Sequence, residues 1–457
     1  MKLYNTKSRS IEDFIPLNDK QVTMYACGPT VYDFTHIGHM RKYIGDDIIR
    51  RTLMLNGYAV KHVMNITDVG HLTGDEDETG EDKMEKGAKK AGKTVWEIAQ
   101  FYTDYFHNTM SAVNVLPPNI EAKATDHVPQ MIALVEKLIA NGVAYETEHA
   151  IYFDVTKDPH YGELSGQKLS EKEVAVRDDV IIDPDKRNPA DFSVWFKRVG
   201  KFADHAMYWP SPWGDGFPGW HIECSAMAMH YLGETIDIHT GGIDHIPVHH
   251  ENEIAQSECA THQQFVKYWI HHDFLNVDGE KMSKSKQNFY TIDDITIRGI
   301  NPVSVRLMFM QTSYRKPLNF TWETLDVAWQ QLRKLEKFAA HHHTIGNADL
   351  SYINAFKEGL SEDLNTAKAL ATVWELIADT EILEEDKWAT VLQLDTVLGL
   401  GLAAVAKFSI TNEAAEMVLA RDLARTEKNY ELSDELRRQL EGLGYEVLDT
   451  ADGTKLL

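Results

Sequence analysis

Three residue types that bind zinc occur within one short stretch of the chain, residues 220–253. Cys224 lies in a segment with helical periodicity, and His249 and Glu253 lie at the start of a second such segment. Residues four apart share one face of a helix, so His249 and Glu253 would point in the same direction. Together the three side chains supply three of the four positions of a tetrahedral zinc site. His250 is an alternative to His249, because it lies three residues before Glu253.

A fourth ligand is found near the N-terminus. Gln21–Ala26 has the pattern of a strand, Ile37–Leu55 that of a helix and Tyr58–Ile66 that of a second strand. This β-α-β order predicts a parallel sheet with ligands bound beyond the carboxyl ends of its strands. Cys27 lies at the end of the first strand, nine residues before His36, and is the candidate for the missing ligand. A closed structural zinc site is the alternative; we favour a metal in a substrate pocket because Cys27 ties it to the first helix.

Two further segments suit a nucleotide. His36 and His39 lie at the start of the first helix, where backbone amides and the helix dipole favour anions. Gly38 between them removes a side chain where a nucleotide could approach. Lys281–Ser285 (KMSKS) follows a turn, and its two lysines suit a triphosphate whose charge redistributes during a reaction. Taken alone, the first segment is better explained as two surface histidines at a helix cap, and the second as a solvated basic loop.

Composition limits the class of protein. The 457 residues are 43% hydrophobic and 25% charged, which is ordinary for a globular protein of several domains. No apolar run is long enough to span a bilayer and no signal peptide opens the chain, so we expect a cytoplasmic protein without a membrane partner. Three cysteines cannot form a disulfide framework. A net charge of -24 argues against general polyanion binding, but a local basic surface could still bind RNA.

The remaining pattern predicts an insertion and a helical C-terminal half. Val143–Tyr145 and Ile151–Val155 resemble a hairpin within the insertion. A charged, glycine-punctuated run at residues 74–93 indicates a solvated loop. The expected helices are Thr94–Val113, Val128–Ala140, Trp322–Ala340, Ser351–Ile377 and Lys387–Leu398. A long charged helix after Glu413, reaching Leu440, and a short strand at Tyr445–Leu448 complete the chain.

At this point the chain resembles the class I aminoacyl-tRNA synthetases, whose HIGH and KMSKS motifs match His36–His39 and Lys281–Ser285. Longer strings are similar to cysteinyl-tRNA synthetases in particular, and the similarity extends over nearly the whole chain. These strings are Cys27–Asp33, Asn65–Asp68, Asp191–Trp195, Gly219–Met227 and Leu448–Thr454.

The resemblance implies a Rossmann-like, doubly wound parallel-sheet catalytic domain at residues 1–116 and 205–300. Residues 117–204 would be a connective insertion, residues 301–405 a stem-contact and helical bundle region, and residues 406–457 an anticodon-binding unit. The implied partners are ATP with Mg²⁺, L-cysteine and tRNA(Cys), and the protein is expected to be a monomer.

The resemblance also implies the role of each site residue. Cys27, Cys224, His249 and Glu253 would hold one Zn²⁺ per chain. His36, His39, Lys281 and Lys284 would be catalytic. The ATP-binding residues would be His36, Gly38, His39, Gly241, Gly242, Asp244 and Lys284. The pocket for the amino acid would be lined by Gly28, Thr30, Thr67, Trp220 and His239.

The need to separate cysteine from serine explains why such an enzyme would use zinc. Zinc prefers thiolate and lowers the pKa of a bound thiol. Serine is close to cysteine in size, so an apolar pocket would separate the two poorly, whereas direct metal–sulfur coordination rejects the hydroxyl.

Two alternatives keep the same fold. A ligase that joins cysteine to an amino sugar would not need the C-terminal unit; a helix bearing Arg421, Arg425, Lys428, Arg437 and Arg438 argues for tRNA instead. A non-catalytic RNA-binding relative would not need intact motifs. The sequence departs from the family at Val69–Leu72, at Phe217, at Thr240 and at its Lys-Leu-Leu end.

Overall fold

The computed structural model describes residues 1–70, 88, 92–167, 185–282, 288–342, 344–406, 412–443, 445, 447–450 and 453–456. Most of the charged run at 74–93 and the whole of residues 283–287, which include Lys284, lie outside the described residues. Among the described helices, none is long and apolar enough to cross a membrane.

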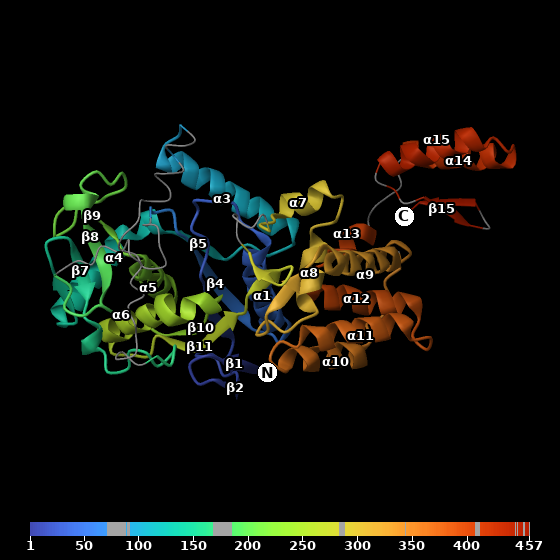
Figure 1. Ribbon diagram of the computed structural model, residues 1–457. Coiled ribbons are helices and arrows are strands. Elements are labelled where there is room, and N and C mark those ends of the chain that lie inside the picture. The colour runs from blue at the N-terminus through green and yellow to red at the C-terminus, as the bar shows by residue number, and fades with distance from the viewer. Residues whose placement is uncertain are drawn as a thin grey trace.

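A five-stranded parallel sheet forms the centre of the molecule (Figure 1), with the strand order β11-β10-β3-β4-β5. Its strands are Gln21–Ala26 (β3), Ala59–Ile66 (β4), Ile120–Lys123 (β5), Ile236–Gly242 (β10) and Val266–His272 (β11). The chain runs from β3 to β4 and β5, then returns to the other side of β3 as β10 and β11. The strand order therefore reverses between β3 and β10, which confirms the predicted doubly wound α/β class.

Helices and a second sheet surround the centre. The helices are α3 (Val95–Ala112), α4 (Val128–Ala140), α5 (Trp220–Leu232) and α6 (Glu251–Thr261). The second sheet is antiparallel, in the order β6 (Ala144–Glu146), β7 (Ala150–Phe153), β8 (Phe192–Lys197) and β9 (Gly216–Pro218). β5 belongs to the central sheet, although it falls within the range expected for the insertion. The limits of the insertion stay a prediction.

A small sheet leads into the helical half. Its strands are β13 (Glu280–Lys281), β12 (Leu275–Val277) and β14 (Leu318–Phe320), and the short helix α7 (Ile292–Ile297) lies between β13 and β14 in the chain. The helices that follow are α8 (Val303–Met310), α9 (Trp322–Ala340), α10 (Leu350–Ser361), α11 (Thr366–Ala378), α12 (Glu384–Leu398) and α13 (Leu402–Ala406).

The single helix expected at Ser351–Ile377 is two helices, α10 and α11. Asp363 and Leu364 between them have φ angles of 54° and 55°, in the left-handed region that ends a right-handed helix. The Asp363 carboxylate accepts hydrogen bonds from the Tyr4 backbone N–H at 2.8 Å and the Tyr314 hydroxyl at 2.7 Å. These partners lie far away in the sequence, so the helical periodicity carried no sign of the break.

The helix α1 (Ile37–Leu55) has the predicted bounds and connects the two halves of the molecule. The sheet packs against one side of it, and α8 and α12 pack against another. Charged residues on such a helix need partners, because an unpaired buried charge is costly. Lys42 lies 2.7 Å from Asp46, and Asp47 lies 2.6 Å from Arg306. Because α1 contacts both halves of the molecule, its first turn has a fixed position.

The C-terminal unit also differs from the prediction. The expected long helix is two helices, α14 (Asn412–Thr426) and α15 (Tyr430–Gly442), because Lys428 has a φ of 59° and Asn429 caps α15. The expected strand is β15 (Val447–Thr450), paired with β16 (Gly453–Leu456) as a hairpin.

Several residues of the predicted basic surface form ion pairs within the C-terminal unit itself. Arg421 is only 2% exposed and donates to Asp449 and Thr454. Arg425 and Arg437 also pair with Asp449. Most of these cations therefore hold the hairpin against the helices, which weakens their use as an argument for tRNA binding.

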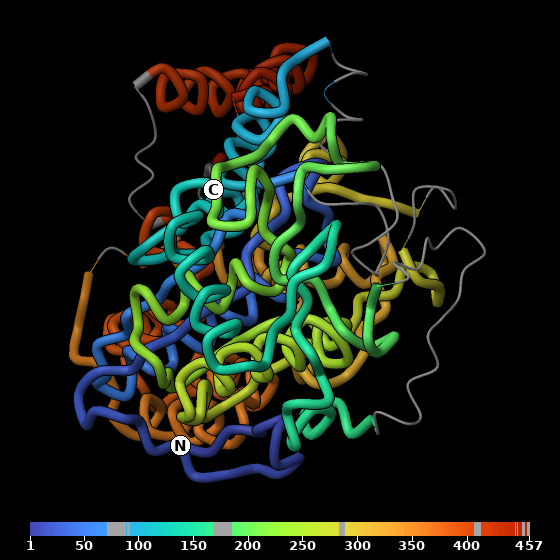
Figure 2. The backbone as a smooth tube through the Cα atoms, turned by 90° about the vertical axis from the view of Figure 1, so that its left-hand side faces the viewer, coloured from blue at the N-terminus to red at the C-terminus, as the bar shows by residue number. Residues whose placement is uncertain are grey.

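An N-terminal hairpin, β1 (Lys2–Asn5) and β2 (Ser10–Asp13), packs beside the edge strand β11. The Trp269 N–H donates to Asn5 Oδ1 at 3.1 Å, and the Thr6 N–H donates to the Trp269 carbonyl at 2.9 Å. Figure 2 shows this N-terminal segment and the helices α14 and α15 at opposite ends of the molecule.

Candidate active site

The carboxyl ends of β3 and β10 meet where the strand order reverses, and the predicted site residues gather there. The backbone N–H of Cys27, which follows β3, donates to the Thr240 carbonyl of β10 at 3.1 Å. A Cβ atom on the next residue, Gly28, would lie 1.6 Å from the carbonyl oxygen of Asn65 at the end of β4. Only glycine permits this approach, so Gly28 acts first through the packing of strand ends.

The four predicted metal ligands come together at this edge of the sheet. Cys27 follows β3, Cys224 lies on α5, His249 lies in a π-helical turn before α6, and Glu253 lies on α6. Their ligand atoms lie within 4.8 Å of one another and all four residues are buried. Glu253 Oε1 lies 3.0 Å from His249 Nε2 and accepts no well-aligned hydrogen bond from the described residues. The donor set therefore fits zinc: it consists of two thiols, an imidazole and a carboxylate with an unused buried oxygen.

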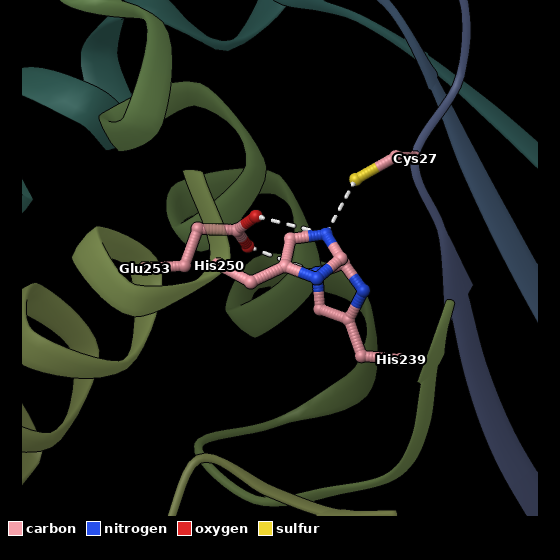
Figure 3. A group of neighbouring side chains, drawn as sticks. All are labelled: Cys27, His239, His250 and Glu253. Carbon is pink, nitrogen blue, oxygen red and sulfur yellow. Dashed lines mark hydrogen bonds and ion pairs between the residues drawn. The ribbon is translucent and has the colours of Figure 1, made fainter. Parts of the chain in front are cut away.

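A second group of possible ligands shares Cys27 and Glu253 with the first. It adds His239 and His250, and its ligand atoms also lie within 4.8 Å of one another (Figure 3). His250 Nε2 lies 3.3 Å from Cys27 Sγ, and His239 Nε2 lies 2.9 Å from Glu253 Oε2. The first group has two cysteine sulfurs and the second has one, so zinc's preference for sulfur favours Cys224 with His249.

Charge is unevenly divided within the cluster. Burial raises the pKa of Cys27, but the hydrogen bond from Cys224 and the neighbouring His250 lower it to well below its usual value. The hydrogen bond to Cys27, together with burial, raises the pKa of Cys224. Burial also opposes ionisation of Glu253, yet the neighbouring histidines lower its pKa overall. The cluster thus favours thiolate at Cys27 and carboxylate at Glu253, the forms in which these groups bind cations.

The other predicted pocket residues lie around the start of α5. The Trp220 ring stacks on the His249 ring with centroids 4.1 Å apart. The Thr67 hydroxyl donates to the buried Glu223 carboxylate at 3.1 Å, and Thr30 and Thr67 form an isolated parallel bridge between their segments. Trp220, Thr67 and Thr30 are therefore placed to border a small molecule that enters the cluster.

His36 and His39 form a stacked pair at the start of α1. Their ring centroids lie 3.6 Å apart. His36 Nδ1 accepts hydrogen bonds from the backbone N–H groups of Gly38 and His39, at 3.1 and 3.4 Å, so His36 caps the helix itself. A neutral ring whose Nδ1 accepts carries its proton on Nε2. Backbone amides at the start of α1 are therefore already used, so an anion at this helix start would meet the His36 imidazole and not those amides.

The segments on either side of residues 283–287 contact this helix start. The Ile37 N–H donates to the Tyr290 carbonyl at 2.9 Å, and the Phe289 ring packs edge-on against His36. A Cβ on Gly38 would lie 3.6 Å from the methyl carbon of Met282. Lys281 is exposed, with its Nζ 5.9 Å from the Phe274 ring centre. The described residues that flank 283–287, Met282 on one side and Phe289 and Tyr290 on the other, thus lie beside the start of α1.

Gly241, Gly242 and Asp244 continue from the end of β10 along the same edge. A Cβ on Gly241 would lie 2.4 Å from the His250 ring, and one on Gly242 would lie 2.2 Å from the Asp244 carboxylate. Asp244 is exposed, and its charge acts on His39. The two glycines therefore allow a close turn beside the histidine cluster. We call this turn and the start of α1 with His36 and His39 the helix-start region.

The sequence reasoning missed two residues that connect these parts. Lys42 of α1 donates to the Cys27 carbonyl, and nothing in its local sequence indicates this. His271, at the carboxyl end of β11, hydrogen-bonds to His250 with the two ring nitrogens 2.7 Å apart. Its place at the end of a parallel strand was the available signal.

Two other features lie outside the site. Phe217, which replaces a frequent arginine of the family, is buried in the inserted sheet and stacks on His205. A cavity of about 470 Å³ between α1, α3 and β4, lined by His62 and Arg50 among others, contains none of the predicted site residues.

Comparison with known proteins identifies relatives over the whole length. Residues 13–330 match the family described as tRNA synthetases class I (C) catalytic domain. A cysteine–tRNA ligase of Treponema denticola is 41% identical over 489 residues, covering 99% of both chains. Cysteine–tRNA ligase 1 of Burkholderia lata is 42% identical over 459 residues, covering 100% of this chain and 96% of the relative.

Solved structures agree on the fold. Mycobacterium tuberculosis methionyl-tRNA synthetase in complex with methionyl-adenylate superposes with a TM-score of 0.56 at 16% identity, covering 88% of this chain and 93% of that one. The Agrobacterium radiobacter LeuRS–tRNA–LeuAMS complex gives a TM-score of 0.59 at 12% identity, with 87% and 86% covered. The identity to the curated relatives and the catalytic-domain match show that this chain belongs to the cysteine–tRNA ligases of the class I aminoacyl-tRNA synthetase family.

Proposed function

We propose that this protein activates L-cysteine with ATP and transfers it to tRNA(Cys). The observation that carries the proposal is the convergence of Cys27, Cys224, His249 and Glu253 beside the helix start that bears His36. In the first step the cysteine carboxylate attacks the α-phosphorus of ATP and pyrophosphate leaves. In the second, a ribose hydroxyl at the 3′ end of the tRNA attacks the activated carbonyl, and AMP leaves.

The four converging residues would hold one zinc ion. A bound zinc would act as a Lewis acid that favours the thiolate form of the substrate cysteine. Trp220, His239, Thr67, Thr30 and Gly28 would border the amino acid. Serine lacks the sulfur that such a site recognises, so its activation should be far slower.

The residues of the helix-start region would bind the nucleotide. His36 and His39 would donate from Nε2 to phosphate oxygens as charge builds up on them. Gly38, Gly241, Gly242 and Asp244 would lie against the adenosine. Lys281 and Lys284 would neutralise the departing pyrophosphate together with Mg²⁺.

The activity is tested by cysteine-dependent exchange of pyrophosphate into ATP, with serine as the matched competitor and tRNA charging measured in parallel. The expected result is strong exchange with cysteine, little with serine, and charging of tRNA(Cys). Absence of cysteine-dependent exchange from zinc-loaded protein would refute the proposal. Exchange without charging would point to the amino-sugar ligase, which the full-length similarity to cysteine–tRNA ligases does not favour.

A Lys284→Ala variant tests the assignment of the loop. It should bind cysteine normally and form adenylate slowly; loss of zinc from this variant would contradict the assignment. The monomeric state, the cytoplasmic location and the anticodon-binding role of residues 406–457 stay predictions.

A further inference from the structure

A series of hydrogen bonds connects the sulfur of Cys27 to the N-terminal hairpin. Cys27 Sγ lies 3.3 Å from His250 Nε2, and His250 Nδ1 lies 2.7 Å from His271 Nε2. His271 Nδ1 lies 2.8 Å from the hydroxyl oxygen of Thr6, at the end of β1. Both rings are at least 96% buried, since His250 is 0% and His271 is 4% exposed. We call Thr6, His271 and His250 the imidazole series.

The donors in this series all point the same way. The neutral form of an imidazole ring has one donor and one acceptor nitrogen, and both nitrogens of each ring have a partner here. A metal-bound thiolate has no proton, so His250 must donate from Nε2 and accept at Nδ1. His271 must then donate from Nε2 and accept at Nδ1 from the Thr6 hydroxyl. Every polar atom of the two rings is satisfied in this arrangement.

Thr6 is held in place independently of the rings. Its backbone N–H donates to the Trp269 carbonyl, and the side chain of Asn5 bonds to the Trp269 N–H at 3.1 Å and to the Lys267 carbonyl at 2.9 Å. These contacts fix the end of β1 against the edge strand β11. The hydroxyl of Thr6 therefore has a rigid support from which to orient His271.

We propose that the imidazole series positions the Cys27 sulfur within the metal centre, with His250 as a donor to the sulfur and not as a metal ligand. An N–H···S bond fixes the direction of the sulfur lone pairs and withdraws charge from a thiolate, and partners of this kind tune metal binding. The inference rests on the metal site of the proposed function. It gives the N-terminal hairpin a role in that site although the hairpin lies outside the cluster itself.

The test compares Thr6→Val with Thr6→Ser in the full-length protein. Valine has nearly the shape of threonine but no hydroxyl, whereas serine keeps the hydroxyl. Ser8→Ala is the control for the turn, because the Ser8 hydroxyl bonds only to Asn5 and Ser10 among the described contacts. Zinc affinity is measured by competition with a chromophoric chelator, and the sulfur is observed through the thiolate-to-metal charge-transfer absorption of the Co²⁺-loaded protein.

Thr6→Val should weaken zinc binding about three- to tenfold, below the 10–100-fold effect typical of a residue that touches a ligand directly. It should also shift the charge-transfer band, while Thr6→Ser and Ser8→Ala match the wild type. His271→Phe, which removes both ring bonds, should weaken zinc binding about 10–100-fold. Neither readout needs cysteine, ATP or tRNA. Zinc affinity and the cobalt spectrum can therefore be measured, and this inference tested, even if the ligase activity is absent.

Three outcomes would overturn the inference. Thr6→Val and Thr6→Ser could give the same zinc affinity and the same cobalt spectrum. The wild-type protein could bind neither metal. Finally, His250→Asn could abolish metal binding while His249→Ala retains it, which would make His250 the ligand.

Discussion

The buried cluster around Cys27 and the helix-start region around His36 lie side by side but are built by different means. The cluster consists of side chains from the end of β3, α5, β10, the turn before α6 and α6 itself, which hold one another. In the helix-start region, one side chain caps the backbone of its own helix within four residues. The cluster therefore depends on long-range packing and the helix-start region on local structure. Substitutions should separate the two, affecting metal and cysteine binding in one and nucleotide chemistry in the other.

The largest effect is expected from Cys224→Ser. Removing a ligand thiolate should cut zinc affinity and cysteine activation together by at least about 100-fold, since even residues outside the ligand shell contribute 10–100-fold. Metal analysis and pyrophosphate exchange measure the two effects. Cys259→Ser is the matched control, because Cys259 is half-buried and lies outside the cluster. Full zinc content with normal activation in Cys224→Ser would show that the cluster is not the metal site of the enzyme.

The next effect tests whether the helix-start region is independent of the metal. His36→Asn should slow pyrophosphate exchange about 100-fold, as the loss of one donor to a charged transition state does, and leave zinc content unchanged. Asparagine is a good helix cap, so this variant keeps the start of α1. His36→Ala should show the same slow exchange and also lose about 1 kcal/mol of stability. Loss of zinc from His36→Asn would mean that the two regions are one unit.

A smaller effect is expected where the cluster borders the substrate. The Thr67 hydroxyl accepts from Asn65 Nδ2 at 3.0 Å and donates to the buried Glu223 carboxylate at 3.1 Å. Thr67→Val removes both bonds, so the KM for cysteine should rise about tenfold, equivalent to a cost of 1–2 kcal/mol. Thr67→Ser keeps the hydroxyl and should behave as wild type. A change in the KM for ATP and not for cysteine would assign Thr67 to the nucleotide site instead.

The smallest effect concerns the scaffold that both regions share. Burial lowers the pKa of His62, on β4, from 6.5 to about 4, so between these values the folded protein binds fewer protons than the unfolded one. Its contribution to stability is complete above about pH 6.5 and falls by about 1.4 kcal/mol per pH unit as the pH decreases toward 4. The melting temperature of His62→Gln, measured relative to that of the wild type, should therefore be higher at pH 5.5 than at pH 7.5. A difference that does not change with pH would contradict this.

The sequence predicted those elements whose ends are set locally. The bounds of α1, α4 and α9 agree with the expected ranges, since each has a regular apolar pattern, and α1 and α9 also have side-chain caps. The left-handed residues near Asp363 and at Lys428 were not predicted, because long-range contacts and a single strained residue break the pattern there. Propensity yields to tertiary contacts at such points.

The candidate site shows the same division. Local pattern places His36 and His39 at the start of α1, as the structure has them, and the expected ligands Cys27, Cys224, His249 and Glu253 do lie together. Spacing could not reveal that His250 lies as close to Cys27 as it does, nor that His271 supports it, since both depend on how β3, β10 and α6 meet.

The reversal of strand order between β3 and β10 also has a consequence for synthesis on the ribosome. Cys27 and His250 are separated by 223 positions in the chain. At about 5–20 residues per second, Cys27 waits roughly 10–45 s before its partners have been translated. During that time the thiol has no metal and no buried pocket, and is open to oxidants and to stray metal ions. The nascent chain is therefore most vulnerable to redox stress at the residue on which substrate selection is proposed to depend.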